Sequence, residues 1–257
     1  MKSLKHYFQK AYAEKFAIGQ FNFSDWSQVK GIVAAAQQLK SPIILGTSEG
    51  ESKFVGLQEA VAVRNVLRKK TGLPIFLNLD HGKSADYLKE AITAGYDMVH
   101  FDGSKLPLDE NIKISKDVFK FAKWRGVVVE GEVGRFGTDA SKVYTEKFEI
   151  KEEDLTKVDE AVRYLKETGA DILAVSVGTF HGVDASGQSP HLKLDMLGIS
   201  KININTDTRL AFANALKKAL GEPNAEITPY KYLAGPIEAV RVLIEEKIRL
   251  FGSENRV

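Results

Sequence analysis

The sequence has no cysteine among its 257 residues, which excludes disulfides, thiolate metal ligands and cysteine nucleophiles. Any metal ligand must therefore be a histidine, an aspartate or a glutamate. The chain also lacks an excess of one charge, because 36 lysines and arginines oppose 34 aspartates and glutamates. These charges alternate along the expected helices instead of clustering, so the sequence does not indicate a nucleic-acid surface.

Long hydrophobic runs are missing as well. No apolar stretch approaches the roughly 18 residues of a membrane-spanning helix, and the amphipathic start MKSLKHYFQKAYAEKF has no signal-peptide core. We therefore expect a cytoplasmic protein without a membrane partner. With 44% hydrophobic and 27% charged residues, a chain of this length can bury one large core. We expect a single barrel domain over residues 1–257 with a C-terminal helical extension.

One unit repeats along the chain: a short run rich in β-forming residues, then a helical pattern, then a glycine. Alternating strands and helices force parallel pairing through right-handed crossovers. The expected fold is α/β, either a (β/α)8 TIM barrel or an open doubly wound sheet. No nucleotide-binding glycine motif follows a strand, which weakens the second alternative. The strand-like runs are 20–23, 42–47, 74–79, 98–101, 127–133, 172–177 and 201–206.

A barrel places its chemically useful side chains at the carboxyl ends of its strands. Polar residues occur at all seven predicted strand ends, whereas an isolated one would be no more than a helix cap. They are Asn22, Ser24, Thr47, Ser48, Glu49, Asp80, His81, Asp102, Ser104, Glu130, Glu132, His181, Asn203, Asn205 and Thr206. This distribution favours the barrel.

Two of the five histidines, His81 and His181, each precede a glycine at the end of a predicted strand. With the carboxylates of Asp102 and Glu132 they would form a nitrogen and oxygen site suited to zinc or a related divalent ion. Each histidine could equally be structural. Strand alternation points Asp80 away from the side of His81, while the turn there could bring it to a substrate as a proton donor. The alternative role for Asp80 is a helix cap.

These residues carry a family resemblance. The chain resembles the class II, metal-dependent fructose-bisphosphate aldolases in GQFNF, LGTSEGE, LNLDHG, VHFDGSKLPLDENI, VEGEVGRFG, VGTFHG and KININTDTR. The resemblance implies reversible cleavage of fructose 1,6-bisphosphate to dihydroxyacetone phosphate and glyceraldehyde 3-phosphate through a metal-stabilised enediolate, in glycolysis and gluconeogenesis. It also suggests a homodimer or homotetramer. Tagatose-bisphosphate aldolases share these motifs, and the sequence does not separate the two substrates.

The resemblance implies a role for individual residues. His81 and His181 would bind Zn2+ or another divalent metal, Asp102 and Glu132 would serve a second or alternative metal position, and Asp80 would be the acid/base toward the aldehyde. A monovalent cation is a further cofactor that the resemblance allows. The phosphorylated ketose would be held by Asn22, Ser48, Gly182, Asn203, Asn205 and Thr206.

The chain departs from the family pattern on the loop after the fifth strand and at one position of the third. Ala140 stands where the family most often has a proton-transferring glutamate, so Asp139 or Glu146 would have to substitute. Asn78 replaces a histidine that is common before the D-H-G motif but is not a metal ligand.

The largest departure lies before the last strand. PHLKLD runs directly into MLGISKINI, where the family has a helix, a seventh strand with the third zinc histidine, and another helix. We therefore expect a barrel that is incomplete in the chain as written. A segment could be omitted, which a Cα separation well above 3.8 Å between Asp195 and Met196 would reveal. Alternatively His191 is recruited as a ligand, or the protein is a non-catalytic relative that binds phosphosugars.

Overall fold

The computed structural model describes residues 1–134, 155–176, 199–221 and 226–257. The chain forms two compact units, one of Met1–Leu77 with Leu194–Val257 and one of Asn78–Lys193. Several residues named above lie outside the described ranges, so the expectations for them stay predictions. They are Asp139, Ala140, Glu146, His181, Gly182, His191 and the junction of Asp195 with Met196.

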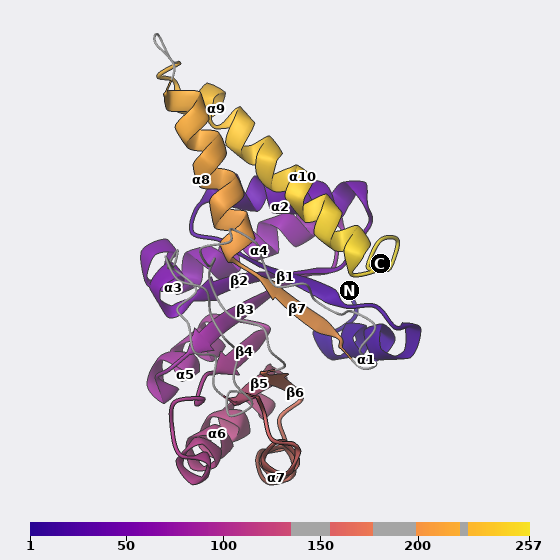
Figure 1. Cartoon of the computed structure of the whole chain (residues 1–257), viewed down its shortest axis with the longest axis vertical. Helices are drawn as coiled ribbons and strands as arrows, with labels where there is room; N and C mark the ends of the chain where they lie inside the picture. Colours follow the sequence, from indigo (N-terminus) through magenta and orange to yellow (C-terminus); the bar gives the residue numbers. More distant parts are fainter. Residues whose placement is uncertain (135–154, 177–198, 222–225) are drawn as a thin grey trace. The chain divides into compact units, whose positions relative to one another are not determined.

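The first unit contains β1 (Ile18–Asn22), β2 (Ile43–Ser48), β7 (Lys201–Ile204) and the start of β3 (Ile75–Gly82). These strands are hydrogen-bonded in the order β7-β1-β2-β3, and β1 runs parallel to both β2 and β7. Its helices are α1 (Leu4–Glu14), α2 (Trp26–Gln38), α3 (Glu49–Val55), α4 (Leu57–Thr71), α8 (Thr206–Leu220), α9 (Pro229–Tyr232) and α10 (Ala234–Leu250) (Figure 1).

Helix α2 shows how the sequence builds this unit. It begins at a capping box, in which Asp25 accepts hydrogen bonds from the start of the helix and Gln28 closes back on the cap. Its apolar face is buried, and α10 packs against it with Val240 fully buried. A Cβ at Gly31 would lie 2.7 Å from the carbonyl oxygen of Ile237. Glycine at this position therefore allows the two helices to approach closely.

The second unit contains the end of β3 with β4 (Met98–Phe101), β5 (Val128–Val133) and β6 (Ile172–Val175). Its strands are paired in the order β3-β4-β5-β6, all parallel. The helices are α5 (Ala85–Ala94), α6 (Leu108–Lys123) and α7 (Val158–Thr168). Helices α5 and α7 end at Gly95 and Gly169 in left-handed conformations, as the glycine positions predicted.

All seven predicted runs form strands, and their parallel pairing confirms an α/β fold of the barrel type. The described residues contain seven strands where a closed (β/α)8 barrel has eight, in agreement with the segment missing from the sequence. Within the described ranges, no helix is both long and apolar enough to cross a membrane.

Candidate metal centre

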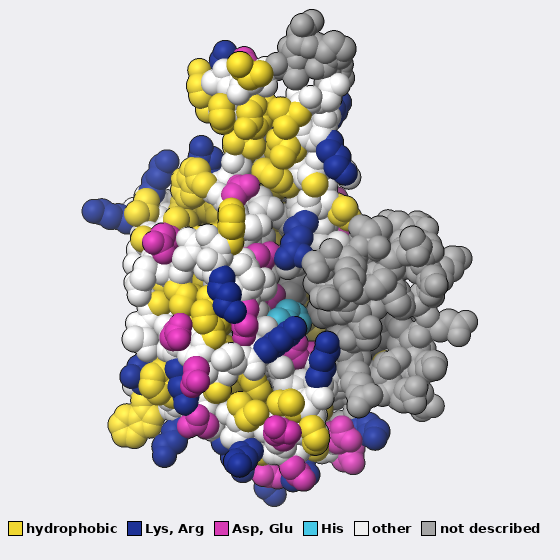
Figure 2. Space-filling view, turned by 90° about the vertical axis from the view of Figure 1, so that its left-hand side faces the viewer, with side chains coloured by type: hydrophobic (Ala, Val, Ile, Leu, Met, Phe, Trp, Pro, Cys, Tyr) yellow, Lys and Arg dark blue, Asp and Glu magenta, His cyan; other side chains and the backbone are white. Residues whose placement is uncertain are grey.

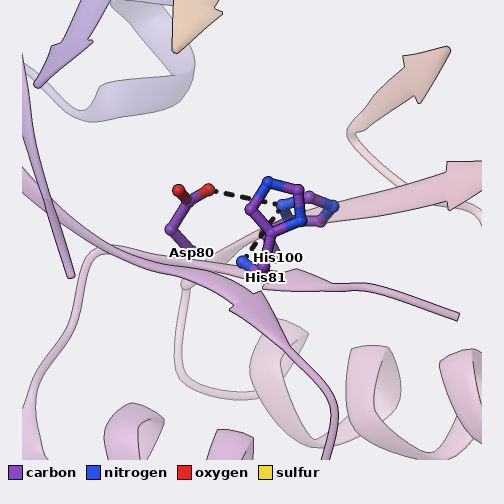
Figure 3. Close-up of side chains that lie close together, drawn as sticks. All are labelled: Asp80, His81 and His100. Atoms are coloured by element: carbon purple, nitrogen blue, oxygen red, sulfur yellow. Dashed lines mark hydrogen bonds and ion pairs between the residues drawn. The ribbon is translucent and has the colours of Figure 1, made fainter. Parts of the chain in front are cut away.

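The centre is built on a β-bulge at the end of β3. Between two paired positions, β3 has two residues, Asp80 and His81, where β4 has one, His100. His81 also adopts a positive φ of 48°, a conformation that is rare for residues other than glycine and that concentrates at functional sites. The bulge interrupts strand alternation, so Asp80 and His81 both approach His100 (Figure 3). Candidate ligand atoms of Asp80, His81 and His100 all lie within 4.8 Å of one another, so strand alternation does not separate Asp80 from His81 as predicted.

Three of the predicted ligands come together at this bulge. His81 Nδ1 lies 3.3 Å from Asp102 Oδ2 and 3.5 Å from Glu132 Oε2. Candidate ligand atoms of all three lie within 4.8 Å of one another. Glu132 is buried and His81 remains 24% exposed, so the group is reachable from one side. The view in Figure 2 shows a histidine at the molecular surface with acidic side chains beside it.

Contacts within this group stabilise the charged forms of His81 and Asp102. Burial alone would lower the pKa of His81, but the charge of Asp80 and the contact with Asp102 raise it above its usual value. Burial would likewise raise the pKa of Asp102, yet hydrogen bonds with His81 and Ser104 hold it well below its ordinary range. The Ser104 hydroxyl donates to Asp102 Oδ1 at 2.6 Å. Asp102 is therefore ionised at neutral pH and available as an oxygen ligand.

His100 belongs to the centre although it was not among the predicted site residues. It is 1% exposed, with Nδ1 at 3.5 Å from Asp80 Oδ1 and 3.9 Å from Glu130 Oε2. Its Nε2 lies 2.9 Å from Glu132 Oε2. Burial opposes a charge on this imidazole, but the three carboxylates raise its pKa well above the ordinary value. A histidine two positions before Asp102 in an apolar strand shares a strand face with it, which is the signal that could have found it.

The donor set fits a divalent metal. Four carboxylates face two imidazoles, so the acidic side chains of the centre outnumber the basic ones. Histidine nitrogens and carboxylate oxygens without thiolates suit zinc and related first-row ions. Asp80 does not cap the next helix, because the N-cap of α5 is Ser84. It contacts His100 in the centre instead.

A buried hydrogen-bond chain positions the end of β5. The Asn111 side chain donates to the backbone carbonyl of Glu132 at 2.9 Å, and Ser115 Oγ donates to Asn111 Oδ1 at 3.1 Å. Ser115 in turn lies 2.6 Å from the hydroxyl of Tyr164. A Cβ at Gly103 would lie 2.3 Å from Asn111 Oδ1, so glycine there leaves room for the chain. Such outer contacts orient a ligand residue.

The first unit holds a separate polar group at the ends of β1 and β2. Asn22 Nδ2 donates to Glu51 Oε2 at 3.1 Å, and the backbone N–H of Ser48 donates to the same oxygen at 2.8 Å. Arg209 Nη2 donates to the other oxygen, Oε1, at 2.6 Å. The sequence singled out Asn22 and Ser48 but not Glu51 or Arg209, whose pairing joins residues 158 positions apart.

The remaining predicted substrate residues lie at and after β7. Asn203 is within the strand, Asn205 is the residue before α8, and Thr206 is the first residue of α8. Asn205 Oδ1 is buried without a hydrogen bond, and its side chain does not cap the helix. The three residues thus lie at the end of a strand, as predicted, and their binding roles stay predictions.

Comparisons with known proteins agree with the fold. The family model described as "Fructose-bisphosphate aldolase class-II" matches residues 2–198 and 193–256. The two matched pieces meet where PHLKLD joins MLGISKINI, which is where the sequence predicted a missing strand. The two pieces overlap at residues 193–198, so the match divides at the point where the sequence departs from the family pattern.

Individual relatives match over nearly their whole length. A sulfofructosephosphate aldolase of Alkalicoccus urumqiensis is 31% identical, over 96% of this chain and 95% of the relative. A fructose-bisphosphate aldolase of Streptococcus pneumoniae is also 31% identical, over 99% of this chain and 98% of the relative. The crystal structure of the YdjI aldolase from Escherichia coli K12 matches with a TM-score of 0.82 and 25% identity, covering 100% of this chain and 99% of that one. The chain belongs to the class II fructose-bisphosphate aldolase family.

Proposed function

We propose that the protein is a metal-dependent aldolase that reversibly cleaves fructose 1,6-bisphosphate to dihydroxyacetone phosphate and glyceraldehyde 3-phosphate. The observation that carries this proposal is the group of His81, Asp102 and Glu132 beside Asp80 at the end of β3. It combines metal ligands with a carboxylate that can move a proton. Membership of the family supports the same reaction class.

His81 would hold the metal together with His181, and Asp102 and Glu132 would serve the alternative position. When bound, a divalent ion supplies a Lewis acid that polarises the ketose carbonyl. A buried carboxylate excess of this kind stabilises the ion, because few water molecules compete for it. His81, His181, Asp102 and Glu132 would therefore bind the metal ion, and Asp80 would transfer the proton.

In cleavage, the Asp80 carboxylate would take the proton of the C4 hydroxyl as the bond between C3 and C4 breaks. The electron pair of that bond passes to the half that becomes dihydroxyacetone phosphate, and the other half leaves as the aldehyde. A second group must then protonate C3, and we propose Asp139 for this step. Condensation runs through the same two transfers in reverse.

Amide, hydroxyl and backbone groups would hold the phosphorylated substrate. We propose that Asn22, Ser48, Gly182, Asn203, Asn205 and Thr206 take this role. Such groups donate to phosphate oxygens and sugar hydroxyls without adding charge. The substrate could also be tagatose 1,6-bisphosphate, whose configuration differs at C4, or a sulfonated sugar phosphate of the kind in the name of the Alkalicoccus relative.

The test is cleavage of each candidate sugar by the full-length protein, measured as release of triose phosphate. Zinc-loaded, chelator-treated and zinc-restored samples are compared with fructose 1,6-bisphosphate, tagatose 1,6-bisphosphate and sulfofructose phosphate. We expect fructose 1,6-bisphosphate to be cleaved fastest, with activity lost on chelation and regained with zinc. Folded, zinc-loaded protein that cleaves none of them would contradict the proposal and favour a non-catalytic phosphosugar-binding protein.

A further inference from the structure

We infer that His100 is itself a ligand of the metal centre, binding the ion through Nε2 beside Glu132. This inference rests on the proposed function for the presence of the ion, and it assigns to the centre a residue that was not among the predicted ligands. His100 is the β4 residue opposite the bulge, so the backbone of both strands fixes its position relative to Asp80 and His81.

The distance between His100 Nε2 and Glu132 Oε2 is the first argument. The two atoms lie 2.9 Å apart, and both are buried without a well-formed hydrogen bond to any of the described residues. Two ligand atoms bound to one zinc ion at 2.0–2.2 Å lie about 3 to 3.5 Å from each other. The same Glu132 oxygen is 3.5 Å from His81 Nδ1. These separations place the three atoms close enough to bind one cation together.

The other nitrogen of the ring supplies the second argument. His100 Nδ1 lies 3.5 Å from Asp80 Oδ1, and histidines that bind a metal commonly donate their second ring N–H to a carboxylate. The backbone N–H of His81 also approaches Nδ1, at 3.3 Å. Nδ1 is thus engaged on its own side of the ring, and Nε2 is the nitrogen that faces Glu132.

Charge balance is the third argument. The imidazole of His100 is enclosed by Asp80, Glu130 and Glu132, whose side chains are all nearly fully buried. Placing several carboxylates in a low-dielectric site is unfavourable unless opposite charge is supplied. A divalent ion bound by His100 and Glu132 supplies two charges at the point where those carboxylates converge. Asp80, His81 and His100 also form a candidate ligand group of their own.

Two substitutions separate a ligand from a packing residue. His100→Asn keeps a polar group near the Nδ1 position and removes Nε2, whereas His100→Gln places an amide oxygen near the Nε2 position. Metal-free full-length protein is titrated with Zn2+ against a chromophoric chelator, and the Co2+ form is examined by visible absorption. His6→Asn, in α1 of the first unit, is the matched control.

We expect His100→Asn to weaken zinc binding by more than about 100-fold, beyond the usual loss from an outer-shell contact. His100→Gln should retain part of the affinity and shift the Co2+ spectrum, and His6→Asn should match the wild type. If His100→Asn does not fold, the Gln variant and its Co2+ spectrum decide the question. Wild-type zinc affinity and an unchanged Co2+ spectrum in folded His100 variants would overturn the assignment.

The readouts also separate this assignment from the proposed function. Zinc bound through His100 in a protein that cleaves none of the sugars would refute the function and support the assignment. Metal-dependent cleavage by a His100→Asn variant with wild-type zinc affinity would refute the assignment alone. A wild-type chain that binds no divalent ion would overturn both.

Discussion

Each unit places a polar group at the carboxyl ends of its strands, and the two groups differ in charge balance. In the first unit, Glu51 is matched by hydrogen bonds from Arg209, Asn22 and the backbone of Ser48. In the second, carboxylates outnumber imidazoles, and two buried ligand atoms make no hydrogen bond to the part of the chain that the structure describes. Equivalent strand ends can therefore hold either a completed network or a site for a cation.

This difference in charge balance predicts a structural role for the first group and a metal-binding role for the second. A completed network rigidifies its surroundings and offers the outer faces of its amides and hydroxyls to a ligand. A group with excess negative charge is stable only when protons or a metal ion neutralise it. We expect substitutions in the first group to change mainly stability, and those in the second to change metal binding and activity.

The largest effect should follow from Asp80→Asn. The amide retains an oxygen that can accept a hydrogen bond from His100, but it cannot take the C4 proton, so kcat should fall about 10²- to 10⁴-fold. Zinc content, measured by elemental analysis, should stay at the wild-type level because the proposed ligands are unchanged. An active Asp80→Asn enzyme would show that the second group binds metal without using Asp80 for proton transfer.

A smaller effect is expected from Glu51→Ala in the first unit. The substitution removes the acceptor of Arg209, Asn22 and Ser48, and lost hydrogen bonds to a charged group cost about 1.5–3 kcal/mol. Urea unfolding should report this loss of free energy of unfolding, while zinc affinity stays unchanged. Glu59→Ala, an exposed acidic residue of α4, is the matched control and should be nearly neutral. Unchanged stability of the Glu51 variant would mean that the first network is not completed as described.

The sequence predicts the strands well because each is an apolar run with turn residues at its ends. It also predicts His81, Asp102 and Glu132 as neighbours, since parallel strands bring their carboxyl ends to one edge. It does not predict the bulge at Asp80. The position of a bulge is set by how β3 pairs with β4, and the local conformational preferences of the residues do not reveal it.

Residues that depend on tertiary contacts were missed for a related reason. His100 sits in the apolar strand MVHF, where a histidine reads as an ordinary core residue. Glu51 and Arg209 belong to helices whose pairing is visible only after folding. The Glu51 network and the metal centre both depend on contacts between residues far apart in the sequence, and the sequence motifs contain only some of their members.

The central claim is that the second group holds a divalent metal ion. Crystals of the full-length protein with zinc, measured on both sides of the zinc absorption edge, test it directly. The account predicts an anomalous peak at bonding distance, about 2.0–2.2 Å, from ligand atoms of His81, Glu132 and His100. A well-ordered centre without an anomalous peak, with His100 contacting only its carboxylates, would contradict it.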